Sequence, residues 1–163
     1  MSALDVLIID DNKSTRDVLR TLLEFEGHSV CCCENGVSGL DLMKERRFEI
    51  IITDYLMPMM KGDEVTRQAR RFCPDSFIIG CSIDARALQF ANAGADTFLN
   101  KEHILHKLPL LIREREAHGE GTCARTFLSY PGRNSLFLEK HDMMVSRSSS
   151  DDPPGDAFSL RSH

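Results

Sequence analysis

Acidic side chains stand directly after two apolar stretches that have the length of β-strands. Asp10 and Asp11 follow the stretch at 3–9, and Asp54 follows the isoleucine-rich stretch at 48–53. Charge is expensive to bury beside branched apolar side chains unless a cation or hydrogen bonds compensate it. Two like charges about 4 Å apart repel by about 4 kcal/mol at an effective dielectric constant of about 20. If the three carboxylates meet, they therefore require a counter-ion.

Two further polar side chains follow apolar stretches later in the chain. Ser82 comes after the stretch at 76–81, and Lys101 comes after the stretch at 95–100. Mg²⁺ binds one or two carboxylates together with water and phosphate oxygens, and a carboxylate can act as a nucleophile towards a phosphoryl group. A lysine ammonium and a serine hydroxyl can bind the phosphoryl oxygens. These residue types together indicate Mg²⁺-dependent phosphoryl chemistry.

The elements that must position these residues alternate between strand and helix patterns up to about residue 118. The stretch at 48–53 lacks polar alternation, which indicates a strand covered on both faces. Apolar residues at helical spacing predict a helix after each strand. The expected strands are 3–9, 29–33, 48–53, 76–81 and 95–100, and the expected helices are 14–27, 36–47, 62–73, 84–94 and 103–117.

The last of these helices contains a proline. Pro109 lacks a backbone donor and would clash with the preceding turn inside one straight helix, whereas proline suits the first helical position. The sequence therefore predicts a turn over 103–107 and a main helix that begins near Pro109.

Five strand–helix pairs in strict alternation predict an α/β domain with a doubly wound, five-stranded parallel sheet and helices on both faces. Ligands of such sheets bind outside the carboxyl ends of the strands, at the topological switch point. The acidic residues, the serine and the lysine are therefore predicted to converge at one edge of the sheet.

The composition narrows the class of protein. The 163 residues are 42% hydrophobic and 28% charged, and the formal net charge of −5 argues against nucleic acid as a direct partner. No apolar run approaches the ~20 residues of a membrane helix, and the first residues lack the basic region of a secretory signal. Six cysteines, three of them consecutive at 31–33, contain no CxxC pair and no zinc spacing, which favours free thiols. We therefore expect a cytoplasmic protein that contacts neither nucleic acid nor membrane.

Residues 119–163 differ in character from the rest of the chain. "SRSSSDDPPGD" at 146–156 has the composition of a disordered segment. "TFLSY" at 126–130 and "SLFLE" at 135–139 are short apolar stretches that could dock on the domain or on a partner. We expect a disordered or loosely docked tail here, and no DNA-binding output domain.

Residues 1–118 resemble a receiver domain of two-component response regulators. The matching motifs are "DD" after the first strand, "TDYLMPMMKG" around Asp54, Ser82 after the fourth strand, and "FLNK" ending in Lys101. The resemblance implies a flavodoxin-like (βα)5 fold with strand order 2-1-3-4-5 and a chain similar to single-domain chemotaxis regulators.

The resemblance also implies roles for the acidic residues. Asp54 would be the phosphorylated aspartate. Asp11 and Asp54 would bind Mg²⁺ directly, helped by the backbone carbonyl of Leu56, and Asp10 would act on the metal largely through water.

For the remaining motif residues, the resemblance implies contacts with the phosphoryl group. Lys101 would pair with it, Ser82 would swing to hydrogen-bond it, and Phe98 matches the aromatic residue that turns inward when the serine moves. The sequence departs from the family at two points: Glu102 stands where proline usually follows the lysine, and Phe98 replaces the usual tyrosine.

Each of these residues also has a purely structural interpretation. Aspartate and serine cap helices and turns, acidic residues are favoured at helix N-termini, and lysine is mostly exposed. The functional interpretation is favoured for the acids, the serine and the lysine because they occur together at strand ends. For Phe98, a switch role and a core role both stay open.

The function that we expect is a phosphorylation-activated signalling switch. A histidine kinase or phosphotransfer protein would donate a phosphoryl group to Asp54, and the domain would catalyse its own phosphorylation and dephosphorylation without being a dedicated enzyme. The new charge would draw in Ser82 and Lys101 and alter the face formed by the fourth helix, fifth strand and fifth helix, where a downstream protein would bind.

Three other functions are weighed against this one. A receiver-like module that binds partners without phosphorylation is possible because Glu102 departs from the family pattern. A Mg²⁺-dependent phosphatase with an aspartyl-phosphate intermediate usually has a second acid two residues after the nucleophile, where this chain has Leu56. A flavin-binding domain is disfavoured because paired acids at the first strand would repel its phosphate.

Two side positions bear on the lifetime of the phosphoryl group. Leu56, two residues after Asp54, places an apolar side chain where water would approach, whereas Asp84, two residues after Ser82, could orient that water. The sequence does not rank these opposing effects.

Overall fold

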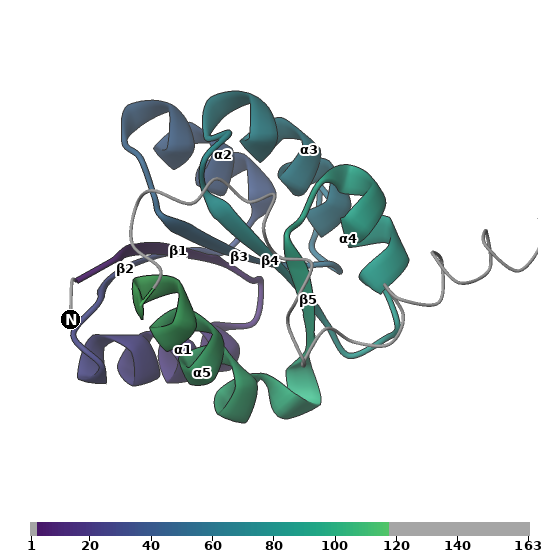
Figure 1. Cartoon of the computed structure of the whole chain (residues 1–163). Coiled ribbons are helices and arrows are strands. Elements are labelled where there is room, and N and C mark those ends of the chain that lie inside the picture. Colours follow the sequence, from purple (N-terminus) through teal and green to yellow (C-terminus); the bar gives the residue numbers. More distant parts are fainter. Residues whose placement is uncertain (1–2, 118–163) are drawn as a thin grey trace, which may run out of the picture. The chain divides into compact units, whose positions relative to one another are not determined.

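Strands and helices alternate along the chain in the computed structural model, which describes residues 3–117 (Figure 1). The strands are β1 (Asp5–Ile9), β2 (Ser29–Cys33), β3 (Ile50–Asp54), β4 (Phe77–Ser82) and β5 (Thr97–Asn100). The helices are α1 (Lys13–Phe25), α2 (Gly36–Glu45), α3 (Gly62–Phe72), α4 (Ala87–Ala93), the short 3-10 helix η1 (Lys101–His103) and α5 (Ile104–Ala117). The tail predicted over 119–163 lies outside the described residues.

The strands form one parallel sheet in the order β2-β1-β3-β4-β5. This confirms the predicted doubly wound, flavodoxin-like architecture. The strand order reverses between β1 and β3, and Ile9 of β1 lies opposite Thr53 of β3. Asp10 and Asp54 each come one residue later, so the register brings them to the same edge of the sheet.

The sheet is buried between two layers of helices. Alternate residues of β1 point to opposite faces: Val6 and Ile8 pack in one cluster with α1 and α5, whereas Leu7 and Ile9 pack in another with α2 and α3. Figure 1 shows the same division, with α1 and α5 below the sheet and α2, α3 and α4 above it. None of the helices described over 3–117 is long and apolar enough to cross a membrane.

The prediction for the last helix is wrong. Pro109 lies inside α5, which begins at Ile104, and the preceding turn is η1 at Lys101–His103. Ile104, Leu108 and Ile112 are spaced one turn apart and are all buried in the core. Burial of such a side chain contributes roughly 1.5–3 kcal/mol, so the three together outweigh the cost of about 3 kcal/mol for an internal proline.

The fourth helix is shorter than the predicted 84–94. It begins at Ala87 because Asp84 belongs to a turn in which its backbone N–H donates to the Ser82 hydroxyl at 3.3 Å. Gly94 ends the helix in the left-handed region with a φ of 98°, where glycine is favoured.

The cysteines of the described part are free thiols, as expected. Burial raises the pKa of the Cys33 thiol to about 11, and it also raises the pKa of Cys81. These two side chains therefore act as small apolar groups of the core.

Candidate functional site

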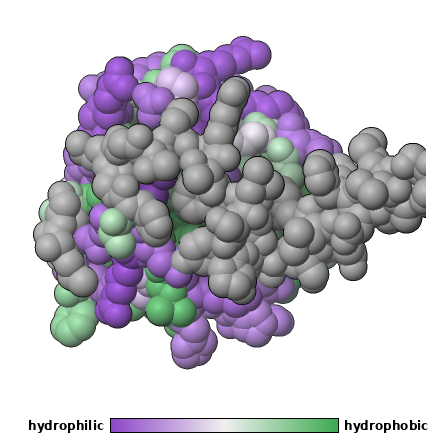
Figure 2. Space-filling view, in the orientation of Figure 1, coloured by the Kyte–Doolittle hydropathy of each residue, from purple (hydrophilic) through white to green (hydrophobic). Residues whose placement is uncertain are grey.

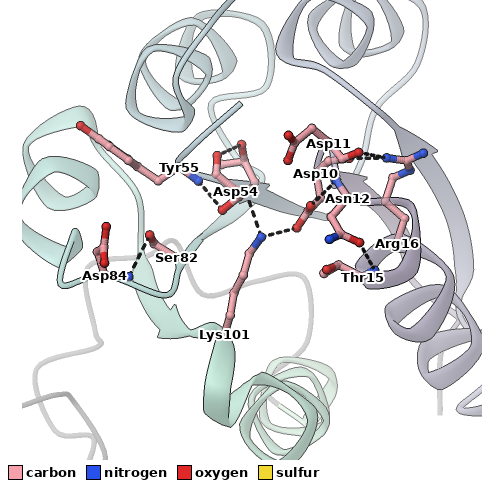
Figure 3. Close-up of polar contacts among 11 residues, drawn as sticks. Asp10, Asp11, Asn12, Thr15, Arg16, Asp54, Tyr55, Ser82, Asp84 and Lys101 are labelled. Carbon is pink, nitrogen blue, oxygen red and sulfur yellow. Dashed lines mark hydrogen bonds and ion pairs between the residues drawn. The ribbon is translucent and has the colours of Figure 1, made fainter. Parts of the chain in front are cut away.

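Three carboxylates and one ammonium meet where β1, β3 and β5 end. Carboxylate oxygens of Asp10, Asp11 and Asp54 lie within 4.8 Å of one another. Figure 3 shows the side chain of Lys101 reaching between Asp54 and Asp10. The structure thus brings together the four charged residues that strand placement predicted to converge.

The loop after β1 is fixed by hydrogen bonds around Asp10. The Asn12 backbone N–H donates to Asp10 Oδ1 at 2.9 Å, and the Asn12 side chain in turn accepts from the Thr15 backbone to cap α1. Arg16 Nη1 donates to the backbone carbonyls of Asp10 at 2.6 Å and Asp11 at 3.0 Å. Asp10 is therefore buried and oriented, whereas Asp11 stays exposed to solvent.

Asp54 is held through its own backbone neighbours. Its Oδ1 accepts from the Tyr55 backbone N–H at 2.8 Å. The same N–H also donates to the Cys81 carbonyl at 2.9 Å, which links this position to β4. Gly62 passes so close that a Cβ there would lie 2.1 Å from the Asp54 carbonyl oxygen. Only glycine allows this approach, which keeps the start of α3 packed against the backbone of Asp54.

Lys101 joins the two buried acids. Its Nζ lies 2.7 Å from Asp10 Oδ2 and 2.9 Å from Asp54 Oδ2, with 16% of the side chain exposed. Burial acts to lower the pKa of the Lys101 ammonium, but the hydrogen bonds to both carboxylates outweigh burial and raise this pKa. For the Asp54 carboxyl, burial is the largest influence and raises its pKa, with Lys101 acting against it.

The charges at this site do not balance. Three carboxylates face the Lys101 ammonium, and the Arg16 guanidinium binds the backbone carbonyls of the two leading acids, so negative charge remains in excess at the site. The donors are hard oxygen atoms, one of them solvent-exposed, which is the chemistry that Mg²⁺ prefers. The residues present therefore fit a divalent cation held at the mouth of the sheet.

Ser82 lies at the end of β4 on the other side of Lys101 (Figure 3). Its hydroxyl oxygen is 3.3 Å from the Asp84 backbone nitrogen, from which it accepts. The following residue, Ile83, is tied to β5 because Asn100 Nδ2 donates to its carbonyl at 3.0 Å. The serine is therefore engaged with the loop that leads to α4.

Leu56 and Phe98 differ in exposure. The Leu56 side chain is mostly exposed at the loop after β3. Phe98 is buried and packs against Phe90, with ring centroids 6.0 Å apart, in a cluster that includes Tyr55. Phe98 is thus a core residue here, and a switch role stays a prediction.

Sequence reasoning missed the residues that orient the site. Arg16 holds the backbone of the two leading acids, and Arg86 stacks on the Tyr55 ring at 4.9 Å. Asn100 ties down Ile83 and also accepts from the Glu102 backbone N–H at 2.8 Å, which caps η1. Asn100 could have been found, because asparagine is a common cap and precedes the lysine; the long arginines carry no comparable signal.

The sequence profile of the response regulator receiver domain matches residues 6–113. The chain belongs to this family. The response regulator MprA of Mycobacterium sp. (strain KMS) is 34% identical over 131 residues, which cover 76% of this chain and 57% of that protein. This chain therefore spans about half the length of the curated relatives it matches.

Solved receiver domains have the same fold. The CheY-like receiver domain protein of Methanospirillum hungatei JF-1 is 28% identical with a TM-score of 0.64, over 72% of this chain and all of that one. The Saccharomyces cerevisiae Ssk1 receiver domain, crystallised with the phosphotransfer protein Ypd1, is 23% identical with a TM-score of 0.64 over 69% of this chain and 88% of that one. The latter similarity shows the fold alone.

The receiver family agrees with the predicted function. Receiver domains are the phosphorylation-activated switches of two-component systems and bind Mg²⁺ at an acidic pocket, and this receiver domain has such a cluster of aspartates. Nothing in the comparisons favours the phosphatase or the flavin-binding domain.

Proposed function

We propose that Asp54 accepts the phosphoryl group in this receiver domain and that Mg²⁺ binds beside it. One observation carries the proposal: Asp54, the acid within the "TDYLMPMMKG" motif, lies 2.9 Å from the Lys101 ammonium and within 4.8 Å of both leading acids. Lys101 also contacts Asp10, at 2.7 Å, so the motif is what distinguishes Asp54 from Asp10. Asp11, Asp54 and the Leu56 carbonyl would hold the ion, and Asp10 would act through water. When bound, the ion neutralises the charge that develops on the phosphoryl oxygens.

The transfer step uses the oxygens of Asp54. One carboxylate oxygen forms a bond to phosphorus as the P–N bond of a phosphohistidine breaks. The electron pair of that bond stays on the imidazole, which leaves as a neutral ring when its other nitrogen carries a proton. Lys101 is already oriented by two carboxylates, so its ammonium can donate to a phosphoryl oxygen without crossing the site.

The response to phosphorylation would begin at Ser82. Its hydroxyl now accepts one long hydrogen bond from Asp84, and it would exchange this for a donation to the phosphoryl group. The loop at 83–86 would then rearrange against Phe98 and α4. We therefore place the downstream protein on the face formed by α4, β5 and α5.

The phosphodonor would be a histidine kinase or a phosphotransfer protein. Support comes from the receiver family and from the Ssk1 domain, which was crystallised with such a phosphotransfer protein. Free thiols in the described part also suit a reducing compartment, so we assign the domain to the cytoplasm.

Intact-mass measurement tests the proposal directly. The full chain is incubated with Mg²⁺ and phosphoramidate, a small donor with a P–N bond, and should gain the mass of one phosphoryl group. Asp54→Asn should not gain it, and chelation of Mg²⁺ should prevent it in the unmodified chain. The control is Asp75→Asn, which alters an exposed aspartate before β4, at the opposite end of the sheet. Equal labelling of Asp54→Asn and the unmodified chain would refute the assignment.

A further inference from the structure

Arg16 in α1 differs from the basic side chains that form only surface ion pairs. Figure 2 shows hydrophilic side chains over much of the visible surface of the described part, and some of the basic ones pair with an acid one helical turn away, as Lys13 does with Asp17. Arg16 instead turns its guanidinium to the backbone. Its Nη1 donates to the Asp10 carbonyl at 2.6 Å and to the Asp11 carbonyl at 3.0 Å, so one nitrogen ties together two consecutive residues of the acidic cluster.

The two carbonyls that Arg16 binds lie where the chain leaves β1. The Asp10 backbone N–H still continues the pairing with β2, because it donates to the Cys33 carbonyl at 3.1 Å. Successive residues of a strand alternate in direction, so the binding of two successive carbonyls by one nitrogen fixes a bend at this point. Beyond the bend, carboxylate oxygens of Asp10 and Asp11 lie within 4.8 Å of Asp54.

The Asp11 carboxylate depends most on this bend. Its side chain is exposed, whereas Asp10 and Asp54 are buried and are both paired with Lys101, at 2.7 Å and 2.9 Å. The like charges of the two buried acids repel the Asp11 carboxylate towards solvent. The backbone that Arg16 holds opposes this movement, so the position of the third carboxylate is set from α1.

We propose that Arg16 is a positioning residue for the divalent cation: by holding the backbone of Asp10 and Asp11, it keeps the Asp11 carboxylate beside Asp54. This role rests on the metal site of the proposed function. A planar guanidinium presents its donors in a fixed geometry, which the point charge of a lysine ammonium lacks. Loss of a residue that orients metal ligands typically weakens metal binding by about 10–100-fold, and we expect the lower end of that range here.

The affinity of the full chain for Mg²⁺ tests this role. Amide chemical shifts of the ¹⁵N-labelled chain are followed by NMR as MgCl₂ is added at constant ionic strength. Arg16→Met should weaken Mg²⁺ binding by about tenfold. Removal of a positive charge would by itself tighten the binding of a cation, so weaker binding reports lost positioning. Arg16→Lys keeps the charge but not the planar fork, and should also weaken binding.

Lys13→Met is the matched control. It removes a positive charge three residues earlier in α1, but that ammonium pairs with Asp17 at 2.5 Å and not with the loop. The control should bind Mg²⁺ at least as tightly as the unmodified chain does. Lysine and methionine are both good helix formers, so none of these replacements weakens α1 through helix propensity.

Hydrogen exchange in EDTA measures the loop without the ion. The Asn12 backbone N–H donates to Asp10 Oδ1 at 2.9 Å, so its exchange rate reports whether the bend stays closed. Arg16→Met should speed this exchange by about tenfold and leave the amide of buried Ile52 unchanged. A purely structural loss of stability would speed both and would leave the Mg²⁺ affinity of the folded chain as it was.

The outcomes separate this role from the proposed phosphorylation. Equal or tighter Mg²⁺ binding by Arg16→Met, or full affinity in Arg16→Lys, would overturn the role of Arg16; the lysine variant decides alone if the methionine variant does not fold. An unmodified chain without measurable Mg²⁺ binding would refute the metal site and this role together. If only the phosphorylation of Asp54 is wrong, the chain gains no phosphoryl mass, yet Arg16→Met still weakens Mg²⁺ binding.

Discussion

Replacing Asp54 with asparagine should stabilise the domain when no divalent cation is present. At an effective dielectric constant of about 20, the ion pair with Lys101 at 2.9 Å favours the ionised carboxylate by about 6 kcal/mol. Repulsion from buried Asp10 at 4.8 Å or less opposes this by at least about 3.5 kcal/mol, and exposed Asp11 adds about 1 kcal/mol after screening by water.

These Coulomb contributions nearly cancel, so the cost of burying the carboxylate decides the sign. That cost is several kcal/mol for a buried ion, and burial is the main reason that the pKa of Asp54 is raised. We therefore expect Asp54→Asn to increase the free energy of unfolding by about 1–2 kcal/mol in EDTA, which moves the Tm by about 4–8 °C.

Magnesium should reverse this order. A cation at 100 times its dissociation constant stabilises the folded state by about 2.7 kcal/mol, and Asp54→Asn removes one of the ligands. Urea unfolding followed by circular dichroism, in EDTA and then across a MgCl₂ series, measures both effects, with NaCl at matched ionic strength as the control. A variant that is less stable than the unmodified chain in EDTA, yet equally stabilised by Mg²⁺, would refute the electrostatic reasoning.

Three further outcomes are expected. Lys101→Met should lower the free energy of unfolding in EDTA by about 3–5 kcal/mol, measured by urea titration, because it leaves two buried carboxylates without their ammonium. Leu56→Asn should change the autodephosphorylation rate of phosphorylated Asp54, which is measured from the intact mass over time. An unchanged rate would show that Leu56 does not control it. Alkylation of Cys33 by iodoacetamide in the folded chain should rise about tenfold per pH unit between pH 7 and 10, because only about a thousandth of a thiol with a pKa of about 11 is thiolate at pH 8; a plateau near pH 9 would contradict it.

The fold and the position of the charged cluster follow from local patterns in the sequence. Strand-length apolar stretches that are followed by acids or lysine predict both the parallel sheet and the edge at which Asp10, Asp54 and Lys101 meet, because the carboxyl ends of parallel strands lie at the same edge of a sheet. The extent of α5 was not predictable from Pro109 alone, since the burial of Ile104 depends on a core that only the assembled domain provides.

The site contacts that the sequence did not predict are made by side chains that extend across loops to backbone carbonyls. Arg16 contacts backbone oxygens six and five residues earlier, and Asn100 contacts the carbonyl of Ile83 from a neighbouring strand. Such contacts are set by rotamers of long or flexible side chains, which periodicity does not encode. The helix predicted from position 84 likewise begins later, at Ala87, and the Asp84 side chain pairs with Arg86 at 3.6 Å.

The contacts at the site also show which part of it is able to move. Lys101 is held by short ion pairs to both Asp54 and Asp10, whereas Ser82 accepts one bond of 3.3 Å from the following loop. Exchanging a neutral bond, worth about 0.5–1.5 kcal/mol, for one to a charged phosphoryl group, worth about 1.5–3 kcal/mol, gains about 1–2 kcal/mol.

A complete switch from a 1:99 to a 99:1 population requires about 5.5 kcal/mol. The Ser82 exchange therefore supplies a minority of that energy on the proposed phosphorylation of Asp54, and Lys101 must supply much of the rest by turning from Asp10 to the phosphoryl oxygens. It follows that Ser82→Ala should retain a weakened response, whereas Lys101→Met should abolish it, when the β4–α4 loop is followed by hydrogen exchange with and without phosphoramidate and Mg²⁺. Equal responses in the two variants would contradict this division of the switching energy.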